Sequence, residues 1–194
     1  MGETETTSLD IVSYEEAQTF LGTPDADEDL LKALISRVSA VVEKITGRCF
    51  VIREIVEYFS ADPRDAMLFL SKIPVVEGTV AVEDTIYGTD LTEGTFVDPD
   101  VGSLLRTFGW SPGPRRYKIT YASGYGTKPD ELPGDIRQAV LEILAHKYQH
   151  RTQPGATSET IGDYSYTLGG GADIGAGIPG SALDVLNRYK VPAF

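Results

Sequence analysis

Residues 118–151 read KITYASGYGTKPDELPGDIRQAVLEILAHKYQHR and decide the fold, because they join a strand, a glycine-rich turn and the clearest helix pattern in the chain. Tyr, Ile and Thr favour a β-strand over 117–121. Two glycines and two prolines within 123–133 then allow a sharp turn and exclude a helix before Asp135, whose carboxylate can cap the first helical turn. The stretch therefore predicts a strand, a turn and a helix, in that order.

The helix predicted over about 135–150 carries its apolar side chains on one stripe. The stripe has the three- and four-residue spacing of a helix face and consists of Ile136, Ala139, Val140, Ile143, Leu144 and Tyr148. Burial of each larger side chain contributes roughly 1.5–3 kcal/mol. We therefore expect this helix at the centre of the core.

Two more helices are expected near the N-terminus. Ser13 and Glu16 form a capping-box pattern that starts a short helix over about 13–21. The acidic cluster within 25–29 suits the N-terminus of a second helix over about 26–46. The apolar stripe of this second helix consists of Leu31, Leu34, Ile35, Val38, Val41, Val42 and Ile45.

From about residue 50 to 121 the pattern changes to that of strands. Short runs of β-branched and aromatic residues are separated by Gly, Asp and Pro, and MLFL at 67–70 is interpreted as a short buried run. We predict an α+β fold that is mainly an α-helical bundle, with a small antiparallel β-sheet inserted at about 50–121 and an extended C-terminal arm. The core domain is expected to span 10–151.

The expected arm covers 152–194, where Gly, Ser and Thr become frequent. Within it, SETIGDYSYTL at 158–168 has strand alternation, and a short helix is predicted over about 181–189. A strand on a glycine-rich connection has unpaired backbone groups, which can add to the sheet of another protein. The alternative is a strand that folds back onto its own sheet.

Composition limits the possible functions. The 194 residues include 17 basic and 29 acidic ones, which give a formal net charge of −12. Such a chain would on balance repel nucleic acid, although acidic side chains could also line a passage through which DNA slides. No apolar run approaches the length of a membrane span. Cys49 is the single cysteine, which excludes an internal disulfide and a multi-cysteine metal site.

No pattern of catalytic, cofactor-binding or metal-binding residues is convincing. A G-x-G-x-x-G match at 175–180 is followed by too few residues for a dinucleotide-binding unit. Glu142, His146 and His150 share one helical row, but surface histidines also suit a helix C-terminus. The acidic residues at 25–29 lack the glycine and the glutamate of a calcium loop. No nucleophile and base are paired, so an enzyme is not expected.

Four motifs occur along the chain in a recognisable order: TGRCF at 46–50, LSKIPVVEGTVAV at 70–82, TYASGYG at 120–126 and, after a proline-rich gap, AHKYQHR at 145–151. Their order and spacing resemble the head-to-tail connector proteins of tailed phages, also called adaptor or head-completion proteins. The resemblance covers about 10–151.

The resemblance implies a structural protein of the virion. It implies a ring of about twelve copies between the portal protein and the tail, which extends the DNA channel and completes the head. The implied partners are further copies of the chain, the portal protein and a tail-side stopper or tail terminator protein. DNA would pass without sequence-specific contact, and no membrane is involved. The protein would lie at the head–tail interface, after assembly in the host bacterial cytoplasm.

Under this interpretation the arm binds the portal or another partner. The residues predicted to do so are the apolar and aromatic side chains of its strand and its end, namely Ile161, Tyr164, Tyr166, Leu168, Leu186, Tyr189 and Phe194. Two alternatives remain at this point. One is a tail-side or stopper protein of the same particle, and the other is an enzyme or small-ligand-binding domain with a site between the sheet and the helices.

Overall fold

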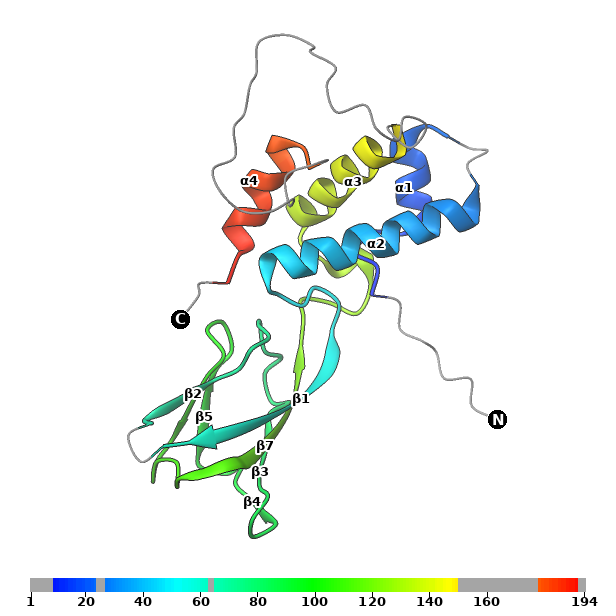
Figure 1. The fold of residues 1–194 in the computed structure, drawn as a ribbon. Coiled ribbons are helices and arrows are strands. Elements are labelled where there is room, and N and C mark those ends of the chain that lie inside the picture. The colour runs from blue at the N-terminus through cyan, green and yellow to red at the C-terminus, as the bar shows by residue number, and fades with distance from the viewer. Residues whose placement is uncertain (1–8, 24–26, 63–64, 150–177, 192–194) are drawn as a thin grey trace, which may run out of the picture.

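The computed structural model describes residues 9–23, 27–62, 65–149 and 178–191. Its helices gather in one helical unit, and its strands form a β unit that lies at one end of the helices (Figure 1). The helices are α1 (Tyr14–Leu21), α2 (Glu28–Thr46), α3 (Gly134–Gln149) and α4 (Gly180–Tyr189), with a 3₁₀ turn at Pro129–Glu131 before α3. The two units are joined where α2 leads into the first strand and where the last strand leads into α3.

Capping residues set the ends of the first two helices. The Ser13 hydroxyl accepts a hydrogen bond from the backbone N–H of Glu16 at 3.1 Å, and the Asp27 carboxylate accepts one from the N–H of Leu30 at 3.1 Å. Gly22 and Gly47 end α1 and α2 with φ values of +62° and +75°. This left-handed conformation is easy only for glycine, so both helices stop there.

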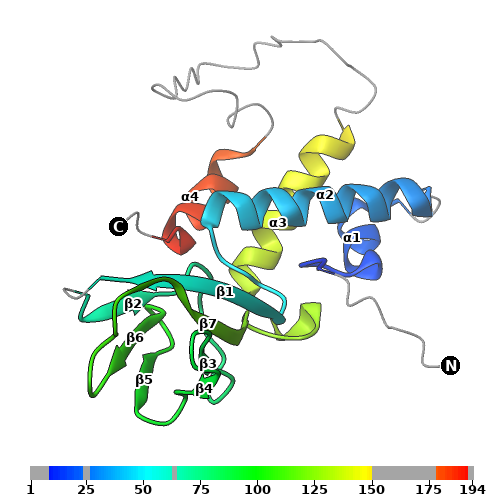
Figure 2. The same ribbon diagram turned by 60° about the horizontal axis from the view of Figure 1, so that its bottom comes forward.

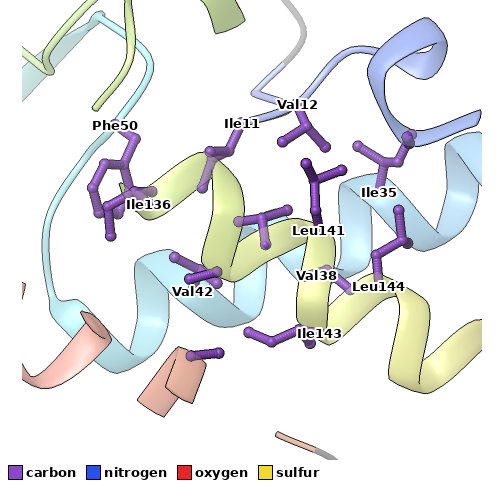
Figure 3. Close-up of a cluster of buried hydrophobic side chains, with 14 of the residues drawn as sticks. Ile11, Val12, Ile35, Val38, Val42, Phe50, Ile136, Leu141, Ile143 and Leu144 are labelled. Carbon is purple, nitrogen blue, oxygen red and sulfur yellow. The ribbon is translucent and has the colours of Figure 1, made fainter. Parts of the chain in front are cut away.

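The helical unit is held together by a cluster of side chains between α2 and α3 (Figure 3). Most of the predicted apolar stripe of α3 is buried, with Ile136, Val140, Ile143 and Leu144 all at 0% exposure. Tyr148, at its end, is half-buried. The facing side chains come from α2, from the segment before α1 and from Phe50, and include Ile11, Val12, Leu31, Ile35, Val38 and Val42. Since each large side chain contributes roughly 1.5–3 kcal/mol on burial, this contact dominates the stability of the helical unit.

Seven strands form the β unit. They are β1 (Arg53–Ala61), β2 (Met67–Phe69), β3 (Ala81–Asp84), β4 (Thr89–Asp90), β5 (Thr95–Asp98), β6 (Ser103–Arg106) and β7 (Gly113–Ser123). One sheet has the order β1-β7-β3-β4 and the other the order β2-β6-β5, with antiparallel neighbours throughout. In Figure 2 the second sheet lies against the first, on the side of the β unit away from α3.

The β unit has a core of its own. Strand β7 alternates strictly, so that Tyr117, Ile119 and Tyr121 point inward and are at most 1% exposed. The Trp110 ring packs edge-on against Tyr117, with ring centroids 4.8 Å apart. The further buried side chains are Ala61, Leu68, Leu70, Ile73, Val75, Val82 and Leu104. Two sheets that each bury one face against the other are thus stable as a unit.

The prediction of a mainly α-helical bundle with a small inserted sheet is therefore wrong. Of the described residues, 37% are helical and 27% lie in strands, and two antiparallel sheets build a second core. The interpretation of 67–70 as a buried run is also wrong, because Met67 and Phe69 are 48% and 46% exposed. Alternation along β2 buries only every second side chain of the run.

The C-terminal helix α4 packs into the helical unit. Ala182 and Leu186 are fully buried in the cluster that also holds α2 and α3. Residues 180–189 thus form part of the helical core in this structure, whereas residues 150–177 and 192–194 lie outside the described ranges. The division into a core at 10–151 and an arm at 152–194 stays a prediction. Within the described ranges, no helix combines the length and the apolar character needed to cross a membrane.

Candidate functional site

The chain segments that link the two units are fixed by an ion pair. Arg53, at the start of β1, donates from both terminal nitrogens to the two carboxylate oxygens of Glu43 on α2, at 3.0 and 2.9 Å. The Phe50 N–H donates to the same carboxylate at 3.1 Å. Both side chains are less than one third exposed, and a two-pronged pair of this kind sets direction as well as distance. Glu43 therefore orients β1 relative to α2.

Three aromatic rings fill the space beside this pair. Phe50 and Tyr125 stack with ring centroids 5.6 Å apart and an interplanar angle of 17°. Tyr189, at the end of α4, packs its ring against both, at 6.0 and 6.1 Å. Tyr189 is one of the residues that the sequence predicted for partner binding. In the structure its ring packs at the place where α4 meets the loop after α2 and the loop after β7.

Hydrogen bonds hold the end of α4 in this place. The Tyr189 hydroxyl donates to the Asp135 carboxylate on α3 at 2.8 Å. The Arg48 guanidinium donates to the Tyr189 carbonyl at 2.6 Å, and the Val191 N–H donates to the Thr46 carbonyl at 2.8 Å. The C-terminal helix is thus tied to α3, to the end of α2 and to the loop that leads into β1.

The Tyr189 phenol should make stability depend on pH in the alkaline range. Burial, followed by its hydrogen bond to Asp135, raises the pKa of Tyr189 from 10.0 to about 12. The folded chain therefore holds this proton more tightly than the unfolded chain does. Its contribution to the free energy of unfolding is fully present below about pH 10 and is lost as the pH rises through about 12.

Urea unfolding across this pH range, in wild type and Tyr189→Phe, checks the expectation. The variant should be less stable below pH 10 and should lose less stability than wild type between pH 10 and 12, because it has no phenol to titrate at this position. Tyr87→Phe removes a phenol that is 74% exposed and serves as the matched control. Parallel pH profiles for wild type and Tyr189→Phe would contradict the assigned environment.

The structure places only two of the seven predicted partner-binding residues. Leu186 is fully buried in the helical core, so it packs against α2 and α3 and does not offer a contact surface. Tyr189 is half-buried at the junction described above. The other five, Ile161, Tyr164, Tyr166, Leu168 and Phe194, lie outside the described residues. Their role in partner binding stays a prediction.

Sequence analysis missed an exposed apolar surface on the β unit. It consists of side chains on the outward face of β2, β6 and β5, namely Met67, Phe69, Phe96 and Leu105, and we call it the outer face. Beyond β6, the Phe108 side chain is 94% exposed. The available signal was the presence of apolar residues at both even and odd positions of these short strands, which indicates a sheet with two apolar faces.

A cavity of about 340 Å³ opens between β3 and β5. Its lining is mostly aliphatic and consists of Val76, Glu77, Gly78, Val80, Val82, Thr92, Thr95, Val97 and Pro99. Glu77 is the one charged side chain in that lining. Among the described residues, no three His, Cys, Asp or Glu side chains converge as a metal site. The arrangement suits packing or contact with an apolar group.

Comparisons with known proteins identify one family and several similar folds. The sequence model of one family, Head completion protein (HCP), matches residues 10–191. No curated protein matches the chain in sequence. Among solved structures, the fold is similar to a chain from the neck of an empty GTA particle computed with C6 symmetry. That match has a TM-score of 0.69 and 19% identity, and it covers 100% of this chain and 97% of that chain.

Two more solved structures are similar. One is a chain from the virion of a native gene transfer agent (GTA) particle, with a TM-score of 0.68, 18% identity and coverage of 100% of this chain and 96% of that chain. The other comes from the neck of a native GTA particle computed with C12 symmetry, with a TM-score of 0.62, 18% identity and coverage of 100% and 94%. At these identities the likeness establishes the fold.

Proposed function

The chain belongs to the head completion protein family, and from this premise we propose that it forms a ring between the portal and the tail of a phage or phage-like particle. The match over residues 10–191 carries the proposal, because it spans the described parts of both the helical unit and the β unit. The whole fold is thus that of a structural head–tail connector, and the proposal concerns how it is assembled and what it contacts.

A closed ring of this chain is supported by the similar structures. They come from particle necks computed with C6 and C12 symmetry, and the similarity covers nearly the full length of both chains in each case. We propose twelve copies in the ring. The axial partners would be the portal protein on one side and a stopper or tail terminator protein on the other. The protein would reach this place from the host cytoplasm during assembly.

The ring would prolong the channel through which DNA leaves the head. The net charge of −12 supports a passage that repels phosphate groups, so that DNA slides through without sequence-specific contact. The function is then assembly, with no chemical turnover. A small-ligand-binding domain is the alternative, and a shift in melting temperature on adding a metal ion or a nucleotide would indicate it.

Portal binding is proposed for the strand predicted at 158–168. Because α4 belongs to the helical core, the informative variant replaces this segment by a Gly/Ser linker of equal length and keeps α4 in place. The replacement should weaken binding to purified portal protein by about tenfold or more, which corresponds to ~1.4 kcal/mol, and should leave the unfolding midpoint unchanged. Biolayer interferometry measures the binding, and electron microscopy of the mixture shows whether rings form.

A second variant scrambles the order of residues 158–168 without changing their composition. Scrambling removes the alternation of apolar and polar side chains, and it should weaken binding as the linker does. Full portal binding by the linker variant would remove the proposed role of the segment. Binding of the wild type to a preformed connector ring, with none to portal protein, would identify a tail-side or stopper protein instead.

A further inference from the structure

The outer face is aligned by the register of its three strands. Met67 of β2 and Phe96 of β5 are each directly opposite Leu105 of β6, so these three side chains form one row across the sheet. Phe69 lies in the next row, opposite Ser103, which in turn faces Asp98. Directly opposed side chains in antiparallel strands lie about 4.5–5.5 Å apart at Cβ, so the row is continuous.

Both faces of this sheet are apolar. Its inward residues Leu68 and Leu104 are 6% and 0% exposed, whereas Phe96 and Met67 on the outward side are 63% and 48% exposed. An antiparallel sheet with one face in water normally alternates apolar and polar side chains. In both views the described helices lie beside the β unit, and none of them is drawn across the outward side of this sheet (Figures 1 and 2). The outer face therefore has the composition of a surface that another protein covers.

Phe108 stands at the edge of this face on a turn with fixed geometry. The Gly109 N–H donates to the Arg106 carbonyl at 3.0 Å and closes the turn, and the Thr107 N–H donates to the Gly94 carbonyl at 3.3 Å, which ties the turn to the start of β5. Its phenyl ring is 94% exposed. Rigidly presented aromatic side chains are typical anchors of protein interfaces, because little conformational entropy is lost when they become buried.

The net charge of the chain indicates which kind of protein covers the outer face. Two copies that each carry a net charge of −12 repel one another, so a contact between copies is favoured where the surface is neutral. Of the six outward positions of this sheet, four are apolar, Ser103 is uncharged and Asp98 is the one acidic residue. A basic partner would be recognised better by acidic side chains than by this face. A neutral apolar face suits a second copy.

We infer that the outer face, with Phe108 at its edge, is one of the two lateral surfaces by which neighbouring copies of this chain contact each other in the ring. The inference rests on the ring of the proposed function. In a cyclic ring the contact is head-to-tail, so the outer face of one copy meets a different surface of the next copy. Every copy then covers the outer face of one neighbour, and no exposed apolar sheet remains in the closed ring.

Two acidic substitutions in the row test the inference. Phe96→Asp combined with Leu105→Asp should prevent ring closure, because it places two charges in an apolar contact and adds repulsion between acidic copies. Ile86→Asp is the matched control, since Ile86 is 57% exposed in the turn between β3 and β4. Native mass spectrometry counts the copies per assembly, for the chain alone at rising concentration and for the chain mixed with purified portal protein. Circular dichroism confirms that all variants fold.

Thiol protection gives an independent readout of the same surface. In Leu105→Cys the new thiol should react with a maleimide in the single chain and should be protected at least about tenfold in the ring, because the next copy covers it. Ile86→Cys should react equally in both states. The natural Cys49 is fully buried, and burial raises the pKa of its thiol, so it contributes little background.

The possible outcomes separate this inference from the proposed function. Rings from the wild type and the Ile86→Asp control, with single copies from the double variant, would support the inference. Rings of normal size from the double variant, or a Leu105→Cys thiol that stays reactive in the ring, would overturn it and leave the proposed function intact. Normal rings that no longer bind portal protein would assign the face to the portal and also overturn it. Absence of any ring from the wild type would overturn the proposed function itself.

Discussion

Leu186→Ala is expected to lower the free energy of unfolding by about 3 kcal/mol, within the range of roughly 2–5 kcal/mol for truncation of a fully buried leucine. Leu186 is 0% exposed and belongs to the cluster formed by α2, α3 and α4. Loss of three side-chain carbons leaves a cavity that the helices around it can fill only in part. Urea unfolding of the full chain, followed by circular dichroism, measures the change.

Asn187→Ala is the matched control for this experiment. Asn187 occupies the next position of α4 and is exposed, so its replacement should change the free energy of unfolding by less than about 0.5 kcal/mol. If α4 were part of a free arm, Leu186→Ala would be as harmless as the control. Equal stability of the two variants would therefore restore the interpretation in which the C-terminal helix lies outside the core.

The position of α4 changes how the predicted arm must be regarded. Residues 150–177 connect α3 to α4 in the sequence, and these two helices pack against each other. Ser181 also donates a hydrogen bond to Glu142 on α3, at 2.5 Å, which fixes the start of α4. A partner-binding strand at 158–168 would then lie in a connection held at both ends. Fixed ends limit its reach but also reduce the entropy that it loses on binding.

Helix ends could be predicted from the sequence because they depend on neighbours along the chain. Ser13 caps α1 and Gly47 ends α2 through contacts within four residues, and each of these signals is visible in the sequence. The apolar stripe of α3 is equally local, since its spacing alone defines the buried face. These features needed no knowledge of what packs against the helices.

The size of the β unit and the docking of α4 could not be predicted in this way. Strand β6 has only four residues and pairs with β5, which directly precedes it, and with β2, which ends more than 30 residues earlier in the sequence. The helix at α4 was expected, but Leu186 is buried by side chains of α2 and α3 that precede it by more than 35 residues. Periodicity tells which face of a helix is apolar, and not what covers it.

The outer face was missed for a related reason. Along MLFL every residue is apolar, so the run fits a strand buried on both faces as well as a strand whose outward face awaits another chain. Only the register of β2 against β6 shows that Met67 and Leu105 share the outward row. A surface that becomes buried on assembly has the apolar composition of a core in the sequence. In the single chain it is an exposed apolar patch.

Gly124→Ala is expected to destabilise the chain by about 3 kcal/mol or more, through strain in the backbone at the exit from β7. Gly124 has a φ of +146°, a conformation that side chains rarely allow. An added Cβ would lie 2.6 Å from the Ile52 nitrogen and 2.7 Å from the Ile52 Cα. These are backbone atoms of the chain that leads into β1, so they cannot rotate out of the way.

The strain would act on the link between the two units. The Tyr125 N–H donates to the Phe50 carbonyl at 2.8 Å, and the Ile52 N–H donates to the Gly126 carbonyl at 2.8 Å, so the strands entering and leaving the β unit are tied together at this point. To relieve the clash, these bonds must lengthen. The change should therefore also disturb the Phe50–Tyr125 ring stack beside them.

Gly134→Ala provides the control, because Gly134 is the first residue of α3 and an added Cβ there meets nothing within 4 Å. It should alter the free energy of unfolding by less than about 1 kcal/mol, and in the stabilising direction if the backbone geometry suits alanine. Thermal and urea unfolding of both variants give the comparison. If Gly124→Ala were as stable as Gly134→Ala, the two connections could separate without cost, and the relative placement of the helical unit and the β unit would not be set by this contact.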